Sequence, residues 1–279
     1  MPELPEVETI RRIVEPQIVG RTISDVRVLK EQIIAHPASE DFSRSLSGQT
    51  IAELKRRGKF LIFLFTSGDC MVLHLRMTGQ LLVTPPSFPM ERQTHLIATL
   101  SDGNEMRYID IRRFGRFWFL RSDEPDTFTG IDRLGIEPFS EHLTGAYLKE
   151  RLAHRAISIK MALLDQSIVC GIGNIYADEI LYAACLHPEE PCNHFSTRTC
   201  NRIAVTIRDT IEWGIETDAM TPEEYLAGKG KEYRNTPDLR AYGREGKPCL
   251  RCGHTMKRVT IGGRSSCYCP HCQRKKQHT

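Results

Sequence analysis

Four of the ten cysteines constrain the C-terminal end of this chain more than any other feature. Cys249 and Cys252 form one C-x2-C pair, Cys269 and Cys272 form a second, and sixteen residues separate the two pairs. This spacing is typical of a tetrahedral four-cysteine Zn²⁺ site, in which each pair presents two thiolates to one ion. Because four thiolates leave no open coordination position, we expect one structural zinc that folds this segment and takes no part in catalysis.

The segment between the pairs, residues 253–268, is predicted to form a β-hairpin with its turn at Gly262-Gly263. Two disulfides are the competing interpretation, and the absence of an export signal disfavours them. Cys267 is an alternative ligand that breaks the two-residue spacing. The remaining five cysteines are scattered and are expected to be buried or free thiols: Cys70, Cys170, Cys185, Cys192 and Cys200.

Charge is distributed unevenly along the chain. Residues 231–279 carry twelve Lys and Arg against three Asp and Glu, whereas residues 1–230 carry 26 against 32. A basic end on an otherwise acidic chain indicates a polyanionic partner, and a rigid basic finger suits contacts with phosphates. A solubilising tail is the alternative interpretation, which the ordered cysteine pattern disfavours.

Composition places the chain among ordinary globular proteins, with 40% apolar and 26% charged residues. No apolar run approaches the roughly 18 residues of a membrane span. The acidic start does not resemble a signal peptide, so we expect a cytoplasmic protein without membrane contact.

Apolar runs separated by turn residues predict an antiparallel β-sandwich in the first half of the chain. Predicted strands cover residues 60–65, 71–75, 80–83, 95–100, 106–111 and 117–120. A helix at about residues 7–14 is expected to pack against them. The fold class is therefore predicted to be α+β.

The second half is predicted to be helical after a linker at residues 123–142. Thr144, Ser158, Asn174 and Ser196 each stand where a helix is expected to begin, the last opening a long helix with isoleucines at helical spacing. Residues 218–246 are rich in polar residues, glycine and proline, and are predicted to be a long, functional loop.

The first residues of the chain suggest a nucleophile. Met1 before a small residue is normally removed, which would leave Pro2 with a free secondary amine. Such an amine attacks sugar or carbonyl carbons, and the reference pKa of an α-amino group is about 8. Glu3 and Glu6 are placed to move protons beside it. The alternative is a purely structural interpretation, in which these residues form a helix N-terminus with Pro5 in its first turn. The two interpretations are compatible.

Three internal segments suggest contacts with DNA. Residues 55–59 form a basic turn that includes Lys59, and residues 112–116 place Phe114 between arginines, where it can wedge into a base stack. The alternative interpretation of each of these two segments is a basic turn that is exposed to solvent. Residues 171–174 resemble a phosphate-binding helix N-terminus but lack a complete nucleotide fingerprint, so we expect no nucleotide cofactor.

Taken together, these segments resemble the formamidopyrimidine-DNA glycosylase family over nearly the whole chain. The motifs that carry the resemblance are residues 2–9 (PELPEVET), 57–59 (RGK), 74–79 (HLRMTG), 110–115 (DIRRFG), 171–179 (GIGNIYADE), 242–246 (YGREG) and the zinc finger. The resemblance implies a catalytic β-sandwich over residues 1–133, a helix-two-turn-helix DNA-binding domain with a lid loop over residues 134–240, and a zinc finger over residues 241–279.

The resemblance further implies a bifunctional DNA glycosylase and AP lyase that removes oxidised purines, 8-oxoguanine and formamidopyrimidines, from duplex DNA during base excision repair. Pro2 matches the nucleophile, and Glu3 matches the acid/base residue that Glu6 assists. Lys59 matches the lysine of base release and β-elimination, and Arg264 matches the finger arginine of δ-elimination. A monomer bound to damaged double-stranded DNA is expected.

The DNA contacts implied by the resemblance fall into two groups. Met77, Arg112 and Phe114 match the triad that fills the gap left by the flipped base. The other matching positions contact DNA around the lesion: His74, His95, Arg155, Lys160 and Asn174. Gln93 and Cys267 depart from the family pattern, where a histidine and an aromatic residue are usual.

Three alternatives remain at this point. An endonuclease VIII-like enzyme for oxidised pyrimidines is the nearest, and residues 4–8 and 112–114 favour the purine branch over it. A DNA-binding or damage-sensing protein without catalysis would not require Pro2, Glu3 and Lys59 together. An RNA-binding zinc ribbon is disfavoured because the chain has no module of stacking aromatic residues.

Overall fold

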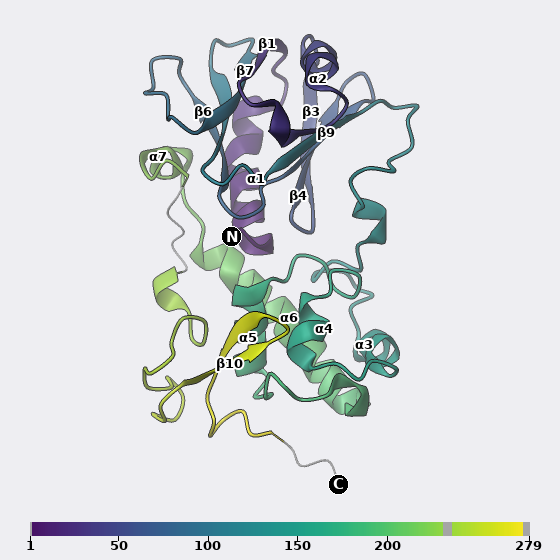
Figure 1. Ribbon diagram of the computed structural model, residues 1–279, viewed down its shortest axis with the longest axis vertical. Helices are drawn as coiled ribbons and strands as arrows, with labels where there is room; N and C mark the ends of the chain where they lie inside the picture. The colour runs from purple at the N-terminus through teal and green to yellow at the C-terminus, as the bar shows by residue number, and fades with distance from the viewer. Residues whose placement is uncertain (1, 231–235, 276–279) are drawn as a thin grey trace. The chain divides into compact units, whose positions relative to one another are not determined.

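The computed structural model describes residues 2–230 and 236–275, and the chain forms two compact units. The first unit comprises Met1–Asp132 with Asp218–Arg234, and the second comprises Arg133–Thr217 with Asn235–Thr279. Strands dominate the first unit, whereas helices and one hairpin form the second (Figure 1). The predicted α+β class is confirmed.

Two sheets face each other in the first unit and enclose its core. One has the strand order β1 (Ile23–Val28), β7 (Thr94–Leu100), β8 (Glu105–Asp110) and β6 (Gly79–Thr84). The other has the order β2 (Ile34–His36), β9 (Arg116–Leu120), β5 (Cys70–His74), β4 (Phe60–Phe65) and β3 (Ile51–Arg57). All strand pairs are antiparallel except β2 with β9. The predicted β-sandwich is confirmed, with one short parallel edge.

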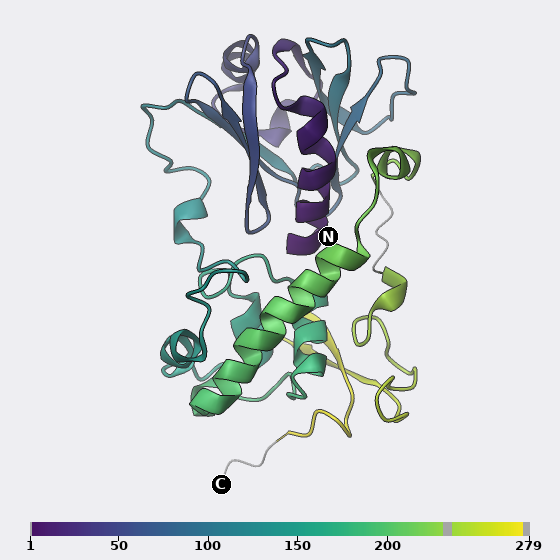
Figure 2. The ribbon, with the colours of Figure 1, turned by 180° about the vertical axis from the view of Figure 1, so that it is seen from behind.

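Helix α1 (Leu4–Ile18) runs along the sandwich, as Figures 1 and 2 show. Val7, Ile10 and Val14 recur at helical spacing and are fully buried in the core of this unit. The helix is longer than predicted because it begins directly after Glu3 and continues past Pro16. A second helix, α2 (Ser39–Leu46), was not predicted, although its apolar side chains are spaced for burial on one face.

A helix also interrupts the segment that was predicted to be a loop. Helix α7 (Pro222–Ala227) begins with a capping box, in which the Thr221 N–H donates to Glu224 Oε2 at 2.8 Å. Tyr225 is 4% exposed within the core of the first unit, and Met220 and Leu226 pack against that core. This burial explains why residues 218–230 join the sandwich, whereas the sequence placed them with the helical domain; residues 231–235 of the predicted loop lie outside the described residues. The T-P-E-E sequence was a usable helix signal that the abundance of polar residues obscured.

The second unit contains helices α3 (Gly145–Leu152), α4 (Ile159–Leu164), α5 (Asn174–Ala183) and α6 (Thr197–Thr217), and a hairpin of β10 (Lys257–Ile261) and β11 (Arg264–Tyr268). Thr144 and Ser158 cap α3 and α4 through their hydroxyls, as predicted. The Ser196 hydroxyl likewise accepts from the Thr199 N–H at 3.2 Å at the start of α6. Short 3₁₀ turns lie at Glu31–Ile33, Ile131–Arg133, Cys192–His194 and Thr236–Asp238.

Among the described residues, no helix is both long enough and apolar enough to cross a membrane.

Candidate active site and zinc centre

The N-terminal end of α1 gathers three of the predicted catalytic residues. Pro2 is buried, and Glu3 and Glu6 are only 1% and 3% exposed. The Glu3 N–H donates to Glu6 Oε2 at 2.7 Å, which is one half of a capping box at the start of the helix. The positive end of the helix dipole favours carboxylates at this place. Glu6 thereby fixes the backbone of Glu3, directly beside Pro2.

A partly buried ion-pair network ties α1 to the end of β3. Glu8 accepts from Arg56 at 3.0 Å and pairs with Arg11 and Arg12, each at 2.9 Å. Burial favours protonated Glu8, yet Arg11, Arg12 and Arg56 outweigh it and lower the pKa of Glu8 to about 2. Lys59 follows in the β3–β4 turn. This turn and the N-terminal end of α1 lie at the same end of the sandwich in both ribbon views (Figures 1 and 2).

The predicted triad comes together on two neighbouring loops of the first unit. Arg112 Nη1 lies 2.9 Å from Met77 Sδ, and the Arg112 guanidinium lies 4.7 Å from the centre of the Phe114 ring. Met77 is 39% exposed and Phe114 45% exposed. An apolar pair this exposed, with a guanidinium over the ring, is suited to entering a base stack.

His74 supports the loop that carries Met77. The Arg76 N–H donates to His74 Nδ1 at 3.0 Å, and Arg76 has a positive φ of 57°. Burial, followed by the charges of Arg76 and Lys59, lowers the pKa of His74 to about 3. The imidazole is therefore neutral at physiological pH, which leaves Nδ1 able to accept this hydrogen bond.

The free energy of unfolding is expected to fall as the pH drops below 6.5, through His74. The unfolded imidazole is protonated there while the folded one, with a pKa of about 3, is not, so the slope reaches about 1.4 kcal/mol per pH unit. His74→Asn retains an acceptor oxygen but cannot titrate. Chemical denaturation between pH 7 and 5 should show a shallower pH dependence for the variant. Parallel profiles would contradict the assignment. The titration of Glu8 does not affect this comparison, because it changes the free energy of unfolding only between pH 4.5, near its ordinary pKa, and its folded-state pKa of about 2.

Two of the predicted DNA contacts are buried and hold other parts of the protein. His95 is 4% exposed, and its Nε2 lies 2.8 Å from the Asp110 carbonyl oxygen. Lys160 is 0% exposed, and its Nζ donates to Asp178 Oδ1 at 2.6 Å and to the Asn174 carbonyl at 2.9 Å. In this structure His95 therefore holds the end of β8, and Lys160 holds the first turns of α5.

The other two predicted contacts are partly exposed. Arg155 pairs with Asp165, and the side chains of both are about one third exposed. The Asn174 side chain donates to the Ser265 carbonyl at 3.1 Å, which ties the start of α5 to β11. Direct contact of these residues with DNA stays a prediction.

Two acidic residues of α5 organise the second unit, although the sequence assigned them no role. Asp178 accepts from Lys160, from the Ser266 hydroxyl and from the Cys267 N–H. Glu179 accepts from three consecutive backbone N–H groups, those of residues 240–242, at 2.8–2.9 Å. Burial raises the pKa of both carboxyls in spite of these donors. Adjacent acids in an otherwise apolar helix were the only available signal.

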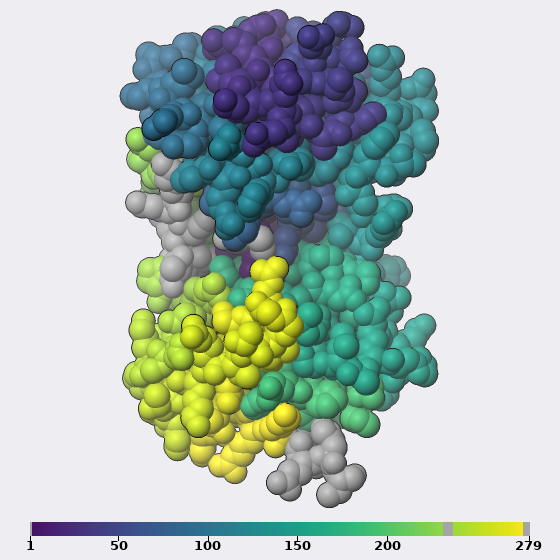
Figure 3. Space-filling model, viewed as in Figure 1, coloured from purple at the N-terminus to yellow at the C-terminus, as the bar shows by residue number. Residues whose placement is uncertain are grey.

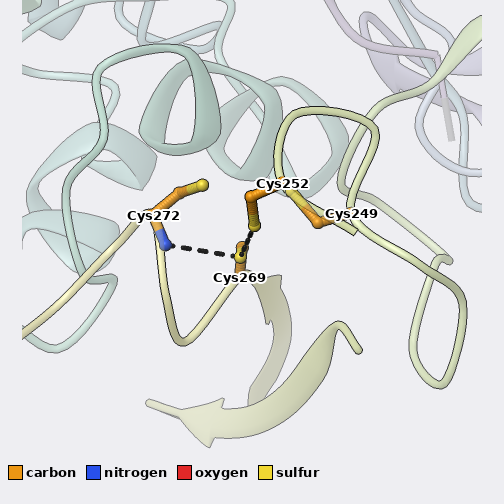
Figure 4. Close-up of side chains that lie close together, drawn as sticks. All are labelled: Cys249, Cys252, Cys269 and Cys272. Carbon is orange, nitrogen blue, oxygen red and sulfur yellow. Dashed lines mark hydrogen bonds between the residues drawn. The ribbon is translucent and has the colours of Figure 1, made fainter. Parts of the chain in front are cut away.

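The four predicted zinc ligands converge on one point (Figure 4). Their Sγ atoms all lie within 4.8 Å of one another, and Cys252 Sγ is 3.4 Å from Cys269 Sγ. Backbone N–H groups of Arg251 and Cys272 point at ligand sulfurs at 3.4 Å, as suits thiolates. Four cysteines from two tight turns fit a tetrahedral structural zinc, as predicted. Cys267 lies outside this cluster, so it does not compete as a ligand.

Arg264 is exposed at the first position of β11, directly after the predicted Gly262-Gly263 turn. Both glycines have positive φ, 55° and 74°, which only glycine adopts readily. The hairpin lies on the surface of the second unit (yellow in Figure 3).

A β-sandwich with a buried acidic helix start and a helical unit with a four-cysteine finger define a two-unit α+β protein of the zinc-finger class. Three family models cover the chain: "Formamidopyrimidine-DNA glycosylase N-terminal domain" matches residues 1–117, "Formamidopyrimidine-DNA glycosylase H2TH domain" residues 134–225, and "Zinc finger found in FPG and IleRS" residues 246–274. The chain belongs to the formamidopyrimidine-DNA glycosylase family.

Similar proteins extend over the whole chain. A formamidopyrimidine-DNA glycosylase of Pelotomaculum thermopropionicum is 41% identical over 99% of this chain and 100% of its own length. The Lactococcus lactis Fpg, solved in complex with abasic-site DNA, is 29% identical with a TM-score of 0.88 and covers 98% of this chain and 100% of its own. A MutM structure in complex with carbocyclic 8-oxo-G DNA is 31% identical with a TM-score of 0.89 and the same coverage.

Proposed function

We propose that this DNA glycosylase is bifunctional: it excises 8-oxoguanine and formamidopyrimidines from duplex DNA and then cleaves the strand as an AP lyase during base excision repair. The observation that carries the proposal is the buried Glu3–Glu6 pair at the start of α1, directly beside Pro2. The relatives named above, solved with abasic and 8-oxo-G DNA, support the substrate class.

The first step is attack by the Pro2 nitrogen on C1′ of the damaged nucleotide, once Met1 has been removed and the base has flipped out of the duplex. The C1′–N bond breaks, and the base leaves with the bonding electrons and takes up a proton. Glu3 moves the protons, because it directly follows the nucleophile in the chain and Glu6 fixes its backbone. Opening of the sugar ring then gives an iminium between C1′ and Pro2.

Strand cleavage follows by elimination. The iminium acidifies C2′–H, so loss of that proton breaks the C3′–O bond, and a second elimination breaks the C5′–O bond. Lys59 assists base release and the first elimination, which its position in the β3–β4 turn supports. Arg264, which is exposed on the finger, holds a phosphate of the DNA and assists the second elimination. Hydrolysis of the iminium returns the free amine.

DNA is held from both units in this proposal. Met77, Arg112 and Phe114 fill the gap left by the flipped base, and Arg112 faces the unpaired cytosine. Their mutual contacts and exposure support this role. His74, His95, Arg155, Lys160 and Asn174 support or contact the DNA backbone, the buried ones through the loops and helix ends they hold. The protein is proposed to act as a monomer without a nucleotide cofactor.

A comparison of lesions tests this function. Duplexes with 8-oxoguanine opposite cytosine and with thymine glycol opposite adenine are incubated with the protein under single-turnover conditions. We expect excision of 8-oxoguanine to be faster by about tenfold or more, a difference of about 1.4 kcal/mol in activation free energy, with phosphate at both ends of the gap. Faster excision of thymine glycol would assign the protein to the oxidised-pyrimidine branch. Binding of abasic duplex without cleavage would make it a binding protein.

A further inference from the structure

Asp110, the last residue of β8, has no part in the chemistry described above, yet its carboxylate is 0% exposed. One oxygen, Oδ1, accepts from the Thr78 hydroxyl and from the Arg112 N–H at 3.1 Å. The other, Oδ2, accepts from the Tyr108 hydroxyl at 3.0 Å and from the Gly115 N–H at 2.9 Å. Thr78 belongs to the loop after β5 and Arg112 and Gly115 to the loop after β8, so one side chain binds both.

The carboxylate is ionised at neutral pH. Burial alone would raise the pKa of Asp110, but the hydrogen bonds from Thr78, Gly115, Tyr108 and Arg112 outweigh it and hold the pKa below its ordinary value. The site therefore requires a side chain with two acceptor oxygens, because each oxygen accepts two hydrogen bonds. An amide side chain would turn an NH₂ group towards two of the four donors, so it would lose its bond to the Arg112 N–H or to the Gly115 N–H.

Both loops contain a residue in the left-handed region. Arg76 has φ 57° and Arg113 has φ 58°, and each precedes a member of the triad, Met77 and Phe114. Such a conformation costs on the order of 1–3 kcal/mol in a residue with a long side chain and persists only when the surroundings fix it. Bonds to Asp110 flank Arg113 on both sides and hold Thr78 two residues after Arg76.

Both loops also close over Tyr108. A Cβ at Gly79 would lie 2.6 Å from the Tyr108 hydroxyl oxygen, and one at Gly115 would lie 1.7 Å from it. Tyr108 is itself fully buried. The two loop backbones therefore approach the same hydroxyl that donates to Asp110, and only glycine permits the approach.

We propose that Asp110 is a positioning residue: it locks the loops of residues 76–79 and 111–115 to each other, so that Met77, Arg112 and Phe114 enter the duplex as one preassembled wedge. The inference rests on the gap-filling role proposed above. A wedge fixed before binding avoids the cost of ordering each side chain on the DNA.

Thr78→Val tests the lock most cleanly. Valine keeps the shape of threonine but removes the hydroxyl that bonds Asp110 and accepts from the Arg112 N–H at 3.1 Å. Thr84→Val is the matched control, because Thr84 lies at the other end of β6, is 2% exposed, and donates to the Pro85 carbonyl at 2.7 Å, away from both loops. Asp110→Asn is the second variant, so the proposal can still be tested if one of the two proteins folds poorly.

Three readouts separate positioning from chemistry. Wedge entry is followed by the fluorescence of 2-aminopurine placed opposite a tetrahydrofuran abasic analogue. Excision is measured on an 8-oxoguanine duplex, and lyase activity on a single-stranded abasic oligonucleotide, which has no stack to enter. We expect Thr78→Val and Asp110→Asn to lose most of the fluorescence change and to slow duplex excision by about tenfold. Single-strand cleavage should stay within about twofold of the wild type, and Thr84→Val should match the wild type throughout.

The possible failures are distinguishable. If wild-type protein excises 8-oxoguanine but Thr78→Val and Asp110→Asn match Thr84→Val in fluorescence and excision, the lock is wrong. An equal loss of single-strand cleavage would also overturn it, because the residues would then act on the chemistry. A wild-type protein that neither excises the base nor cleaves the strand would refute the proposed function itself, on which the lock depends.

Discussion

Pro2→Gly is expected to slow excision of 8-oxoguanine by about a thousandfold, or about 4 kcal/mol of transition-state stabilisation, while duplex binding changes by less than about twofold. The proline ring fixes the position of the nitrogen. Because the amine is secondary, its iminium has no N–H proton to lose and stays cationic. Glycine supplies a mobile primary amine instead. The variant should fold normally, because the bond between the Glu3 N–H and Glu6 that caps α1 remains.

A second variant removes the amine altogether. An additional residue that is not processed, placed before Pro2, converts its nitrogen into an amide, which has no nucleophilic lone pair. Excision should then fall to background even though every side chain is present. Single-turnover kinetics measure the excision rate, and fluorescence anisotropy measures binding. Wild-type excision by either variant would exclude Pro2 as the nucleophile.

Cys249→Ala is expected to unfold the finger and weaken duplex binding by about a hundredfold. Structural zinc contributes on the order of 10 kcal/mol or more to folding of a finger, and three thiolates no longer enclose the ion. The cost extends beyond the hairpin, because Asn174 and Asp178 of α5 both bond to β11. Removal of zinc from the wild type by a chelator should have the same effect. Zinc content and anisotropy at several salt concentrations measure the result.

Cys267→Ala is the matched control for the finger. Cys267 is buried in the same hairpin but lies outside the cluster of ligands, and its contact with Asp178 uses the backbone N–H, which alanine retains. This variant should keep its zinc and bind within a few-fold of the wild type. Because phosphate contacts dominate, binding by both should weaken steeply with salt. Unchanged affinity in the zinc-free Cys249 variant would refute the role of the finger in binding.

The sequence was most informative where the signal is local. The spacing of Cys249, Cys252, Cys269 and Cys272 predicted the metal cluster, because a tight turn is enough to pair two thiols. Apolar runs and turn residues predicted strands β4 to β9 for the same reason, whereas β1 and β3, in which charged residues interrupt the apolar ones, have no predicted range. Helix α7 was missed because polar residues dominate it, although its capping box was visible and only the burial of Tyr225 shows where it packs.

Polar contacts between distant segments could not be predicted in this way. Lys160 and His95 resemble surface contacts in sequence but are buried, because Asp178 and the Asp110 carbonyl satisfy them. The roles of Asp110 and Glu179 depend on backbone N–H groups, which every residue except proline carries and which leave no signature in the sequence. Only the folded arrangement shows which donors each acid receives.

The most direct test of the central claim is borohydride trapping on a duplex with one 8-oxoguanine opposite cytosine, followed by mass spectrometry of the peptides. The account predicts a covalent adduct between the DNA and the Pro2 nitrogen, with Met1 absent. An adduct on a lysine instead would contradict it, as would no adduct from protein that lacks Met1 and binds the duplex.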